Sequence, residues 1–168
     1  LNRVVYISSF SKTISPNIRV GYLAAPPDLL EDLAQLKMIS GLTSSEFTER
    51  LAYGALMDGR WRKHLKGLRE RLQRAHAQVA DRLLQLGFTL FCEPKAGMFL
   101  WACHAQLPDP TELAYKAGEH DILMGPGALF NLDMGPSPWM RWNVAFCEER
   151  VLAFLKAQLD ATHAQARR

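Results

Sequence analysis

The strongest pattern in the chain is an apolar stripe that recurs every three or four residues over residues 60–86. This spacing is that of one face of an α-helix whose other positions are polar. It predicts a single long amphipathic helix over that range, ended by Gly87. The stripe consists of Trp61, Leu65, Leu68, Leu72, Ala75, Val79, Leu83 and Leu86.

Two shorter helices are predicted before the long one. The pair Pro26–Pro27 is a helix-start signal, and the leucines that follow keep helical spacing until Gly41, where the helix is expected to stop. Thr43 with Glu46 three residues later predicts a capping box for a second helix. Gly59 is expected to close that helix.

Two more helices are predicted in the last third of the chain. Thr111 is expected to cap a short helix over 112–119. The last helix is expected over 148–160, and residues 161–168 are expected to form a frayed or disordered tail.

Short runs rich in β-branched and aromatic residues predict strands between these helices. The runs over 88–93 and 98–103 flank a turn at 94–97, which predicts an antiparallel hairpin. Helices interleaved with such strands place the chain in the α/β class. The predicted strands are 4–7, 19–25, 88–93, 98–103, 122–124 and 139–146.

The composition is that of a globular chain. Apolar residues make up 48% and charged residues 22%, and the net charge of +3 is too small by itself to indicate nucleic-acid binding. No apolar run approaches a membrane span, and no signal-peptide pattern opens the chain. Cys92, Cys103 and Cys147 lack metal-ligand spacing and are expected to be reduced core or near-core residues of a cytoplasmic protein. The missing initial Met suggests a fragment of something longer.

Candidate chemistry gathers in residues 8–21, between the first two predicted strands. Lys12 is expected just past a buried strand, on a polar turn, where its amine could attack a carbonyl and form a Schiff base. The hydroxyls of Ser9 and Ser11 and the guanidinium of Arg19 are groups that bind a phosphate. A serine–lysine pair alone is common in solvated turns. The combination Ser-x-Ser-Lys, with an arginine seven residues after the lysine and a glycine two further on, is more specific.

This stretch resembles the fold-type I enzymes that use pyridoxal phosphate, the aspartate aminotransferase superfamily. The similarity is greatest to the branch that includes the aminotransferase-like domains of MocR-type, GntR-family transcriptional regulators. The resemblance implies that Lys12 is the Schiff-base lysine and that Ser9, Ser11 and Arg19 hold the cofactor phosphate. It also implies the C-terminal portion of such a fold, with the end of the large domain over 1–59, a linking helix over 60–86, an α+β small domain with a short antiparallel sheet over 87–160, and a tail over 161–168.

A second candidate site centres on Arg141, the one charged residue in an apolar strand. From the residues alone it is either an edge residue that reaches water or a cation that awaits an anion. The resemblance implies that it grips a substrate α-carboxylate, and that the Gly-Pro-Gly loop with Phe130 precedes that strand. Gly97 is either a turn residue with positive φ or, by resemblance, the glycine where substrate approaches the backbone. The two interpretations of Gly97 are about equally supported.

The polar face of the predicted long helix is basic. It could be a nucleic-acid surface or a solvated helix face, and we favour the solvated face because Glu70 and Asp81 interrupt the charge. The histidines show no metal spacing and no nucleophile partner, and all are expected to be structural or on the surface. They are His64, His76, His104, His120 and His163.

Two functions remain open, besides that of a globular domain without a ligand. The first is the effector-sensing part of a regulator that binds pyridoxal phosphate and an amino acid or amine, and that reaches DNA only through an upstream domain. The second is an aminotransferase that moves an amino group between an amino acid and a 2-oxo acid, with Lys12 also acting as general base. Either implies a homodimer in the full-length protein and no membrane partner. Because the family supplies much of its site from upstream sequence, the chain alone is expected to bind the cofactor weakly or not at all and to be inactive.

Overall fold

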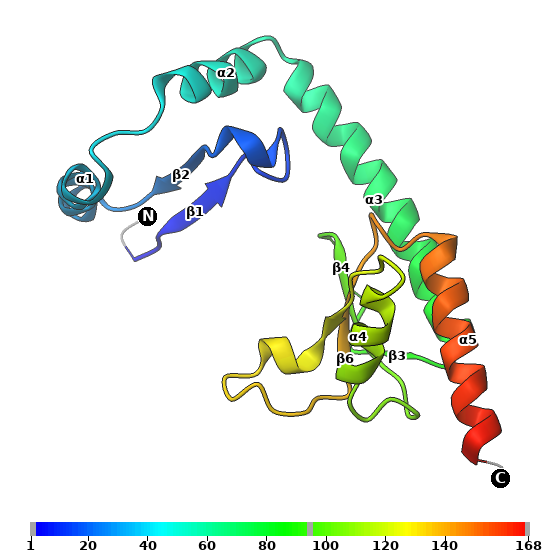
Figure 1. Ribbon diagram of the computed structural model, residues 1–168. Helices are drawn as coiled ribbons and strands as arrows, with labels where there is room; N and C mark the ends of the chain where they lie inside the picture. The colour runs from blue at the N-terminus through cyan, green and yellow to red at the C-terminus, as the bar shows by residue number, and fades with distance from the viewer. Residues whose placement is uncertain (1–2, 94–95, 167–168) are drawn as a thin grey trace. The chain divides into compact units, whose positions relative to one another are not determined.

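The computed structural model describes residues 3–93 and 96–166, with side chains described as far as Thr162 in the last helix. It divides into two compact units, residues 1–68 and 69–168. Figure 1 shows the order of the helices and strands along the chain. Positions 94–95 of the predicted turn and 167–168 of the predicted tail lie outside the described residues.

The first unit contains an antiparallel hairpin and two helices. Strand β1, Tyr6–Ser9, pairs with β2, Gly21–Ala24, in a register that sets Ser9 opposite Gly21. The 3-10 helix η1, Pro16–Ile18, lies in the loop between them. Helices α1, Pro27–Gly41, and α2, Glu46–Met57, follow.

Apolar side chains of the first unit are largely exposed. Ala52 is the one residue of the described part of 1–68 that is fully buried. The expectation that a buried strand precedes Lys12 is wrong for this chain, since Ile7 of β1 is 75% exposed. The physical reason is that β1 and β2 form a sheet of only two strands, too small to bury a face by itself.

The predicted long helix is observed as α3, Arg60–Gln85. Its end has the hydrogen bonds of a Schellman motif, in which the Phe88 amide donates to the Leu83 carbonyl and the Gly87 amide to the Leu84 carbonyl, both at 3.0 Å. Gly87 has a φ of +88°, a left-handed conformation that glycine adopts at little cost. Glycine therefore ends this helix for the reason that the sequence indicated.

The second unit is built on an antiparallel sheet with the strand order β3-β4-β6-β5. Three of its strands, β3, β4 and β6, are shorter than predicted. The strand predicted over 122–124 is absent: the Ile122 amide donates to the Ala117 carbonyl at the end of α4, and the edge strand forms just after it. The elements are β3, Thr89–Leu90; β4, Phe99–Cys103; α4, Thr111–Gly118; β5, Gly125–Pro126; the 3-10 helix η2, Gly127–Phe130; β6, Trp139–Asn143; and α5, Glu149–Ala166.

One face of this sheet forms the core with the helices. Figure 1 shows α5 beside the C-terminal part of α3, and Arg82 of α3 forms an ion pair with Glu149 of α5. Side chains that alternate along β4 and β6 point into this core. The buried cluster contains Val79, Leu83, Phe88, Leu100, Ala102, Leu113, Met140, Trp142, Val144, Leu152, Leu155 and Leu159.

Both predicted helix caps are wrong. Helix α2 begins at Glu46 without a side-chain cap, and the Thr43 hydroxyl donates to its neighbour's carbonyl instead, so no capping box forms. Helix α4 begins at Thr111 itself, and its N-cap is Pro110, which has no side chain that could accept a hydrogen bond. The Asp109 Oδ1 accepts from the Thr111 amide at 3.0 Å and from its hydroxyl at 2.6 Å. An aspartate two residues earlier thus accepts from the first backbone amide of the helix, although it is not the N-cap residue.

Two further expectations need correction. The predicted tail is helical over 161–166, because α5 continues to Ala166 instead of ending at Asp160. Cys92 is exposed and is not a near-core residue, whereas Cys103 and Cys147 are half-buried. Within the described ranges, no helix is both long and apolar enough to cross a membrane.

The adjacent leucines Leu83 and Leu84 give a matched test of the core. Leu83 is fully buried, and Leu84 is 54% exposed on the same helix turn. Leu83→Ala should lower the free energy of unfolding by about 2–5 kcal/mol, because it removes core contacts and leaves a cavity. Leu84→Ala should cost less than about 1 kcal/mol. Urea unfolding followed by tryptophan fluorescence would measure both, and equal costs would contradict the core described above.

Burial raises the pKa of the Cys147 thiol from its ordinary value of 9.0 to about 11. The neutral thiol therefore contributes stability below about pH 9, and this contribution is lost as the pH rises toward 11. At pH 9 we expect iodoacetamide to alkylate exposed Cys92 first and Cys147 last, with the Cys147 rate increasing up to about pH 11. Peptide mass mapping over time would measure the order, and rapid alkylation of Cys147 at pH 9 would contradict its burial.

Candidate functional site

The loop between β1 and β2 is closed by backbone hydrogen bonds that fix the position of Lys12. The Phe10 amide donates to the Val20 carbonyl at 3.0 Å, which joins the two ends of the loop. The Phe10 carbonyl accepts from the amides of Thr13 and Ile14 at 3.1 and 2.8 Å, which forms a tight turn around Lys12. The lysine is thus on the polar turn that the sequence predicted, with an exposed side chain.

The same loop carries the predicted phosphate-binding groups. Ser9 and Arg19 are exposed and Ser11 is half-buried. Arg19 has a left-handed φ of 51°, and its guanidinium donates to the Pro16 carbonyl at 3.4 Å. Among the described residues, no acidic side chain forms an ion pair with Lys12 or Arg19. The loop therefore combines two cations and two hydroxyls without an internal anion.

Two further residues of this loop were not singled out from the sequence. The Thr13 hydroxyl oxygen is buried and has no hydrogen-bond partner within the described residues, so it is available to a bound group. The Phe10 ring packs against Tyr22 and Trp61, with ring centroids 5.3 and 6.4 Å apart. A hydroxyl residue directly after Lys12 and an aromatic residue two before it were the available signals.

In the second unit, Arg141 lies in β6, an internal strand between β4 and β5. It is therefore not at an edge of the sheet, yet its side chain is exposed, because it points away from the core. The guanidinium carbon lies 4.5 Å from the centroid of the Phe99 ring and 4.8 Å from that of Phe130. The rings contact the flat faces of the guanidinium, whereas its N–H groups point outward in its plane. These N–H groups can therefore still donate hydrogen bonds to a carboxylate.

The Gly-Pro-Gly loop places Phe130 against Arg141. A Cβ on Gly127 would lie 2.3 Å from the Ser137 hydroxyl oxygen and 2.6 Å from the Trp139 carbonyl oxygen, so only glycine fits there. This close approach starts η2, at whose end Phe130 lies. The resemblance suggested the loop, and the packing around Gly127 gives the physical reason for its glycine.

The open face of the sheet around Arg141 is aromatic. Trp101 and Trp139 stack with centroids 6.2 Å apart, and Phe130 contacts Trp101 edge-on at 5.2 Å. Beside them lies a cavity of about 370 Å³. Among the described residues that line it, Arg141 alone is charged and the others are largely apolar. Such a lining suits a ligand with a carboxylate attached to an apolar group. The lining residues are Cys92, Phe99, Leu100, Trp101, Phe130 and Arg141.

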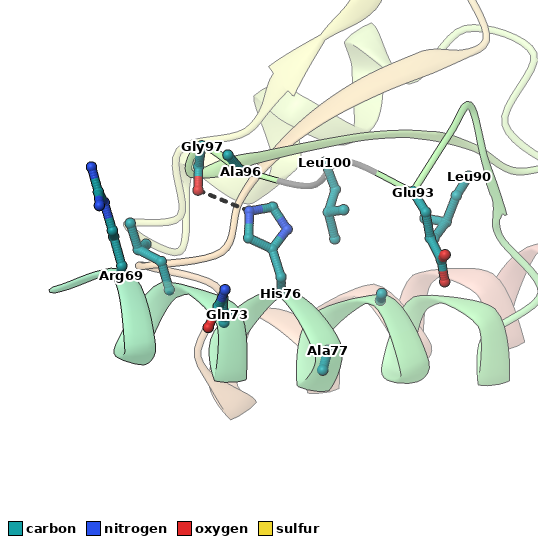
Figure 2. A pocket seen from close by; sticks show the side chains of 11 residues that line it. Arg69, Gln73, His76, Ala77, Leu90, Glu93, Ala96, Gly97 and Leu100 are labelled. Carbon is teal, nitrogen blue, oxygen red and sulfur yellow. Dashed lines mark hydrogen bonds between the residues drawn. The ribbon is translucent and has the colours of Figure 1, made fainter. Parts of the chain in front are cut away.

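Gly97 lies in the turn before β4 and meets the conditions of both of its interpretations. Its φ of +98° is that of a turn glycine, and no atom of the described residues lies within 4 Å of where a Cβ would be, so a ligand could approach the backbone. Figure 2 shows the His76 ring reaching the Gly97 carbonyl, with Nε2 at 2.9 Å from the oxygen. Because a carbonyl only accepts, Nε2 must donate, so His76 has the structural role expected of it.

His76 also lines a cavity of about 410 Å³ between α3 and the β3–β4 hairpin, whose lining side chains are drawn in Figure 2. The Nδ1 atom of His76 is buried and has no hydrogen-bond partner in the described part of the chain.

The predicted site residues form two groups. Ser9, Ser11, Lys12 and Arg19 share one loop of the first unit, whereas Gly97 and Arg141 belong to the second unit.

Comparison with known proteins identifies the family. The model of aminotransferase class I and II matches residues 1–157. The chain belongs to this family. Relatives include the HTH-type transcriptional regulator NorG of Staphylococcus aureus, 32% identical over 77% of this chain and 30% of NorG. The uncharacterized HTH-type transcriptional regulator YisV of Bacillus subtilis is 28% identical over 76% of the chain and 27% of YisV. The resemblance to fold-type I aminotransferase-like domains is therefore confirmed.

Solved structures show the same fold. The multiple substrate aminotransferase of Thermococcus profundus superposes with a TM-score of 0.83 at 21% identity, over 98% of this chain and 42% of that chain. LysN, the α-aminoadipate aminotransferase of Thermus thermophilus, superposes with a TM-score of 0.82 at 25% identity, over 96% of this chain and 43% of that chain. The expected α/β fold, part of an aminotransferase fold, is confirmed, and the chain spans less than half the length of these relatives.

Pyridoxal phosphate is the cofactor of this family. The LysN structure is complexed with N-(5'-phosphopyridoxyl)-L-leucine, and a kynurenine aminotransferase of Pyrococcus horikoshii is complexed with PMP. The residues of the β1–β2 loop fit such a group. They offer an amine for an aldehyde, hydroxyls and a guanidinium for a phosphate, and the free Thr13 hydroxyl. No acid in the described residues forms an ion pair with these cations.

The close contact at Gly127 can be tested against a matched glycine. Gly127→Ala should lower the free energy of unfolding by about 1–3 kcal/mol, because the new methyl group overlaps Ser137 and the Trp139 carbonyl. In Gly118→Ala, at the end of α4, the new methyl group meets no atom of the described residues within 4 Å, and the change should be neutral or slightly stabilising. Urea unfolding midpoints would compare the two variants, and a neutral Gly127→Ala would show that the loop does not need this glycine.

Proposed function

We propose that this chain is the effector-sensing, pyridoxal-phosphate-binding domain of a MocR-type, GntR-family transcriptional regulator. The main support for a bound ligand is the position of Arg141, whose guanidinium contacts the rings of Phe99 and Phe130 on the open face of the sheet. The regulator is favoured over an enzyme because NorG and YisV, which match about three quarters of the chain, are named HTH-type transcriptional regulators.

Each residue of the proposed site has a distinct task. When bound, pyridoxal phosphate supplies an aldehyde and a ring that withdraws electrons. Lys12 would hold the aldehyde carbon through Nζ and could take up or return a proton there. Ser9, Ser11 and Arg19 would bind the phosphate with hydroxyl and charge-assisted hydrogen bonds.

The ligand would be recognised by the second group of residues. Arg141 would bind an α-carboxylate by two parallel hydrogen bonds, with Phe99 and Phe130 fixing the plane of its guanidinium. Gly97 would allow the ligand to approach the backbone, because none of the described residues has an atom within 4 Å of where its Cβ would be. These contacts suit an amino acid. An amine without a carboxylate would leave Arg141 unused.

The remaining parts of the proposal concern the whole protein. Sequence-specific DNA recognition would come from a helix-turn-helix domain outside this chain, as the names of NorG and YisV suggest. The full-length protein would be a homodimer in the cytoplasm. It would signal the presence of an amino acid or amine by a change in the domain that holds the cofactor.

A working aminotransferase is the second candidate function. An uncharacterized aminotransferase of Saccharolobus solfataricus is 28% identical over 89% of this chain and 38% of its own length. The same residues would serve both functions, because binding the ligand precedes any transfer of its amino group. What separates the two is whether the amino group reaches a 2-oxo acid.

The proposal can be tested by titrating the intact natural protein with pyridoxal phosphate. We expect a long-wavelength absorbance band, and borohydride reduction followed by peptide mass mapping should place the label on Lys12. Lys12→Arg should abolish the band, whereas Lys37→Arg, a matched change on α1, should leave it unchanged. The 168-residue chain alone should show a weak band or none.

Three outcomes would count against these expectations. A missing band, or a label on another lysine, would remove the proposed role of Lys12. Tight Lys12-dependent binding by the 168-residue chain would show that upstream residues are not needed. Turnover of an amino acid with a 2-oxo acid by the intact protein would favour the aminotransferase over the sensor.

A further inference from the structure

The N-terminal part of α3 concentrates the positive charge of the chain. Residues 60–74 contain seven of the 20 Lys and Arg residues but only one of the 17 Asp and Glu residues, Glu70. This segment therefore has a charge of +6, compared with +3 for the whole chain. We call its cations the basic face: Arg60, Arg62, Lys63, Lys66, Arg69, Arg71 and Arg74.

The structure shows that this charge is not neutralised within the described residues. All side chains of the basic face are exposed, and only Arg60 forms an ion pair, with Asp58. Asp81, one of the two acids that favoured a solvated helix face, lies beyond the basic face and accepts a hydrogen bond from Gln85. Arg82, also beyond it, pairs with Glu149. Glu70 alone interrupts the basic face.

The helix geometry spreads these cations around the polar side of α3. At 3.6 residues per turn, Lys63, Lys66 and Arg74 lie opposite the apolar stripe of α3, and the other cations flank them. Fifteen residues at 1.5 Å each extend about 22 Å. Along that length of its axis, duplex DNA carries about six phosphates on each strand. The charge and length of the basic face therefore match a phosphate backbone.

We propose that the basic face of α3 docks on the sugar–phosphate backbone of duplex DNA. The choice of DNA among polyanions rests on the proposed regulator function. The contact would add affinity without reading sequence, because Lys and Arg on an exposed helix neutralise phosphates irrespective of the bases. It departs from the expectation from the sequence that DNA is reached only through an upstream domain, because it adds a contact from this chain.

The test uses the 168-residue chain without cofactor and a short fluorescein-labelled duplex of random sequence. Fluorescence anisotropy at several salt concentrations gives the dissociation constant and its salt dependence. The logarithm of the affinity should fall with the logarithm of salt by about 0.9 per neutralised phosphate. Lys63→Gln/Lys66→Gln/Arg74→Gln should weaken binding at low salt on the order of tenfold or more and reduce the slope by about 2.7.

A second triple variant controls for net charge. Lys37→Gln/Lys116→Gln/Lys156→Gln removes the same charge from exposed positions on α1, α4 and α5 and should leave the slope nearly unchanged. Glu70→Gln removes the one acid of the basic face and should tighten binding. Glutamine keeps a helix propensity close to those of lysine and glutamate, and circular dichroism would confirm equal helix content in all variants.

Each remaining outcome would overturn the proposal. Equal losses in both triple variants would mean that binding depends on net charge, and no salt-dependent binding by the unmodified chain would remove the docking site. Binding to phosphatidylcholine vesicles with one-third phosphatidylserine, lost in the Lys63 triple variant, without binding to the duplex would assign the basic face to a membrane surface. None of these results depends on pyridoxal phosphate, so a failure here is distinct from a failure of the cofactor titration.

Discussion

The register between β4 and β6 is the constraint on which the second unit depends. Trp101 lies opposite Arg141, and Ala102 lies opposite Met140. Because side chains alternate along a strand, this register sends Ala102 and Met140 into the core and leaves Trp101 and Arg141 on the open face. A shift of the pairing by one residue would bury the arginine and expose the core side chains. The free energy lost in this way would be far larger than that gained from the hydrogen bonds between the shifted strands. The core and the proposed carboxylate site are therefore on the two opposite faces that this strand pairing creates.

The first unit is held by local contacts and not by a buried core. It contains the loop with Lys12, but Ala52 is its one fully buried residue within the described part of 1–68. Local hydrogen bonds of the Phe10 backbone hold the loop, and aromatic contacts of its ring support it. Such contacts can fix the shape of a turn, yet they bury little apolar area. The relatives of this chain are more than twice as long, which is consistent with a loop that needs further chain around it.

Several elements could be predicted from the sequence because their causes are local. The α3 helix follows from its apolar period, and its end at Gly87 follows from the preference of glycine for a left-handed conformation. The caps could not be predicted as well. Thr111 is a good capping residue, but α4 begins at Thr111 itself with Pro110 as its N-cap, and only the backbone geometry decides where the first turn starts. The burial of β1 was also mispredicted, because an apolar strand does not show which surface covers it.

The sequence by itself determined the family, the order of its motifs and the chemistry that they offer. Lys12, Ser9, Ser11 and Arg19 are close together in the chain, so a local motif was enough to propose them, although their roles stay predictions. Only the tertiary structure decided that Arg141 lies on an open face between two phenylalanine rings, and that Gly127 fits because Ser137 and Trp139 approach it. These contacts join residues that are distant in sequence, and distance in space is set by strand register and packing, which no local pattern encodes.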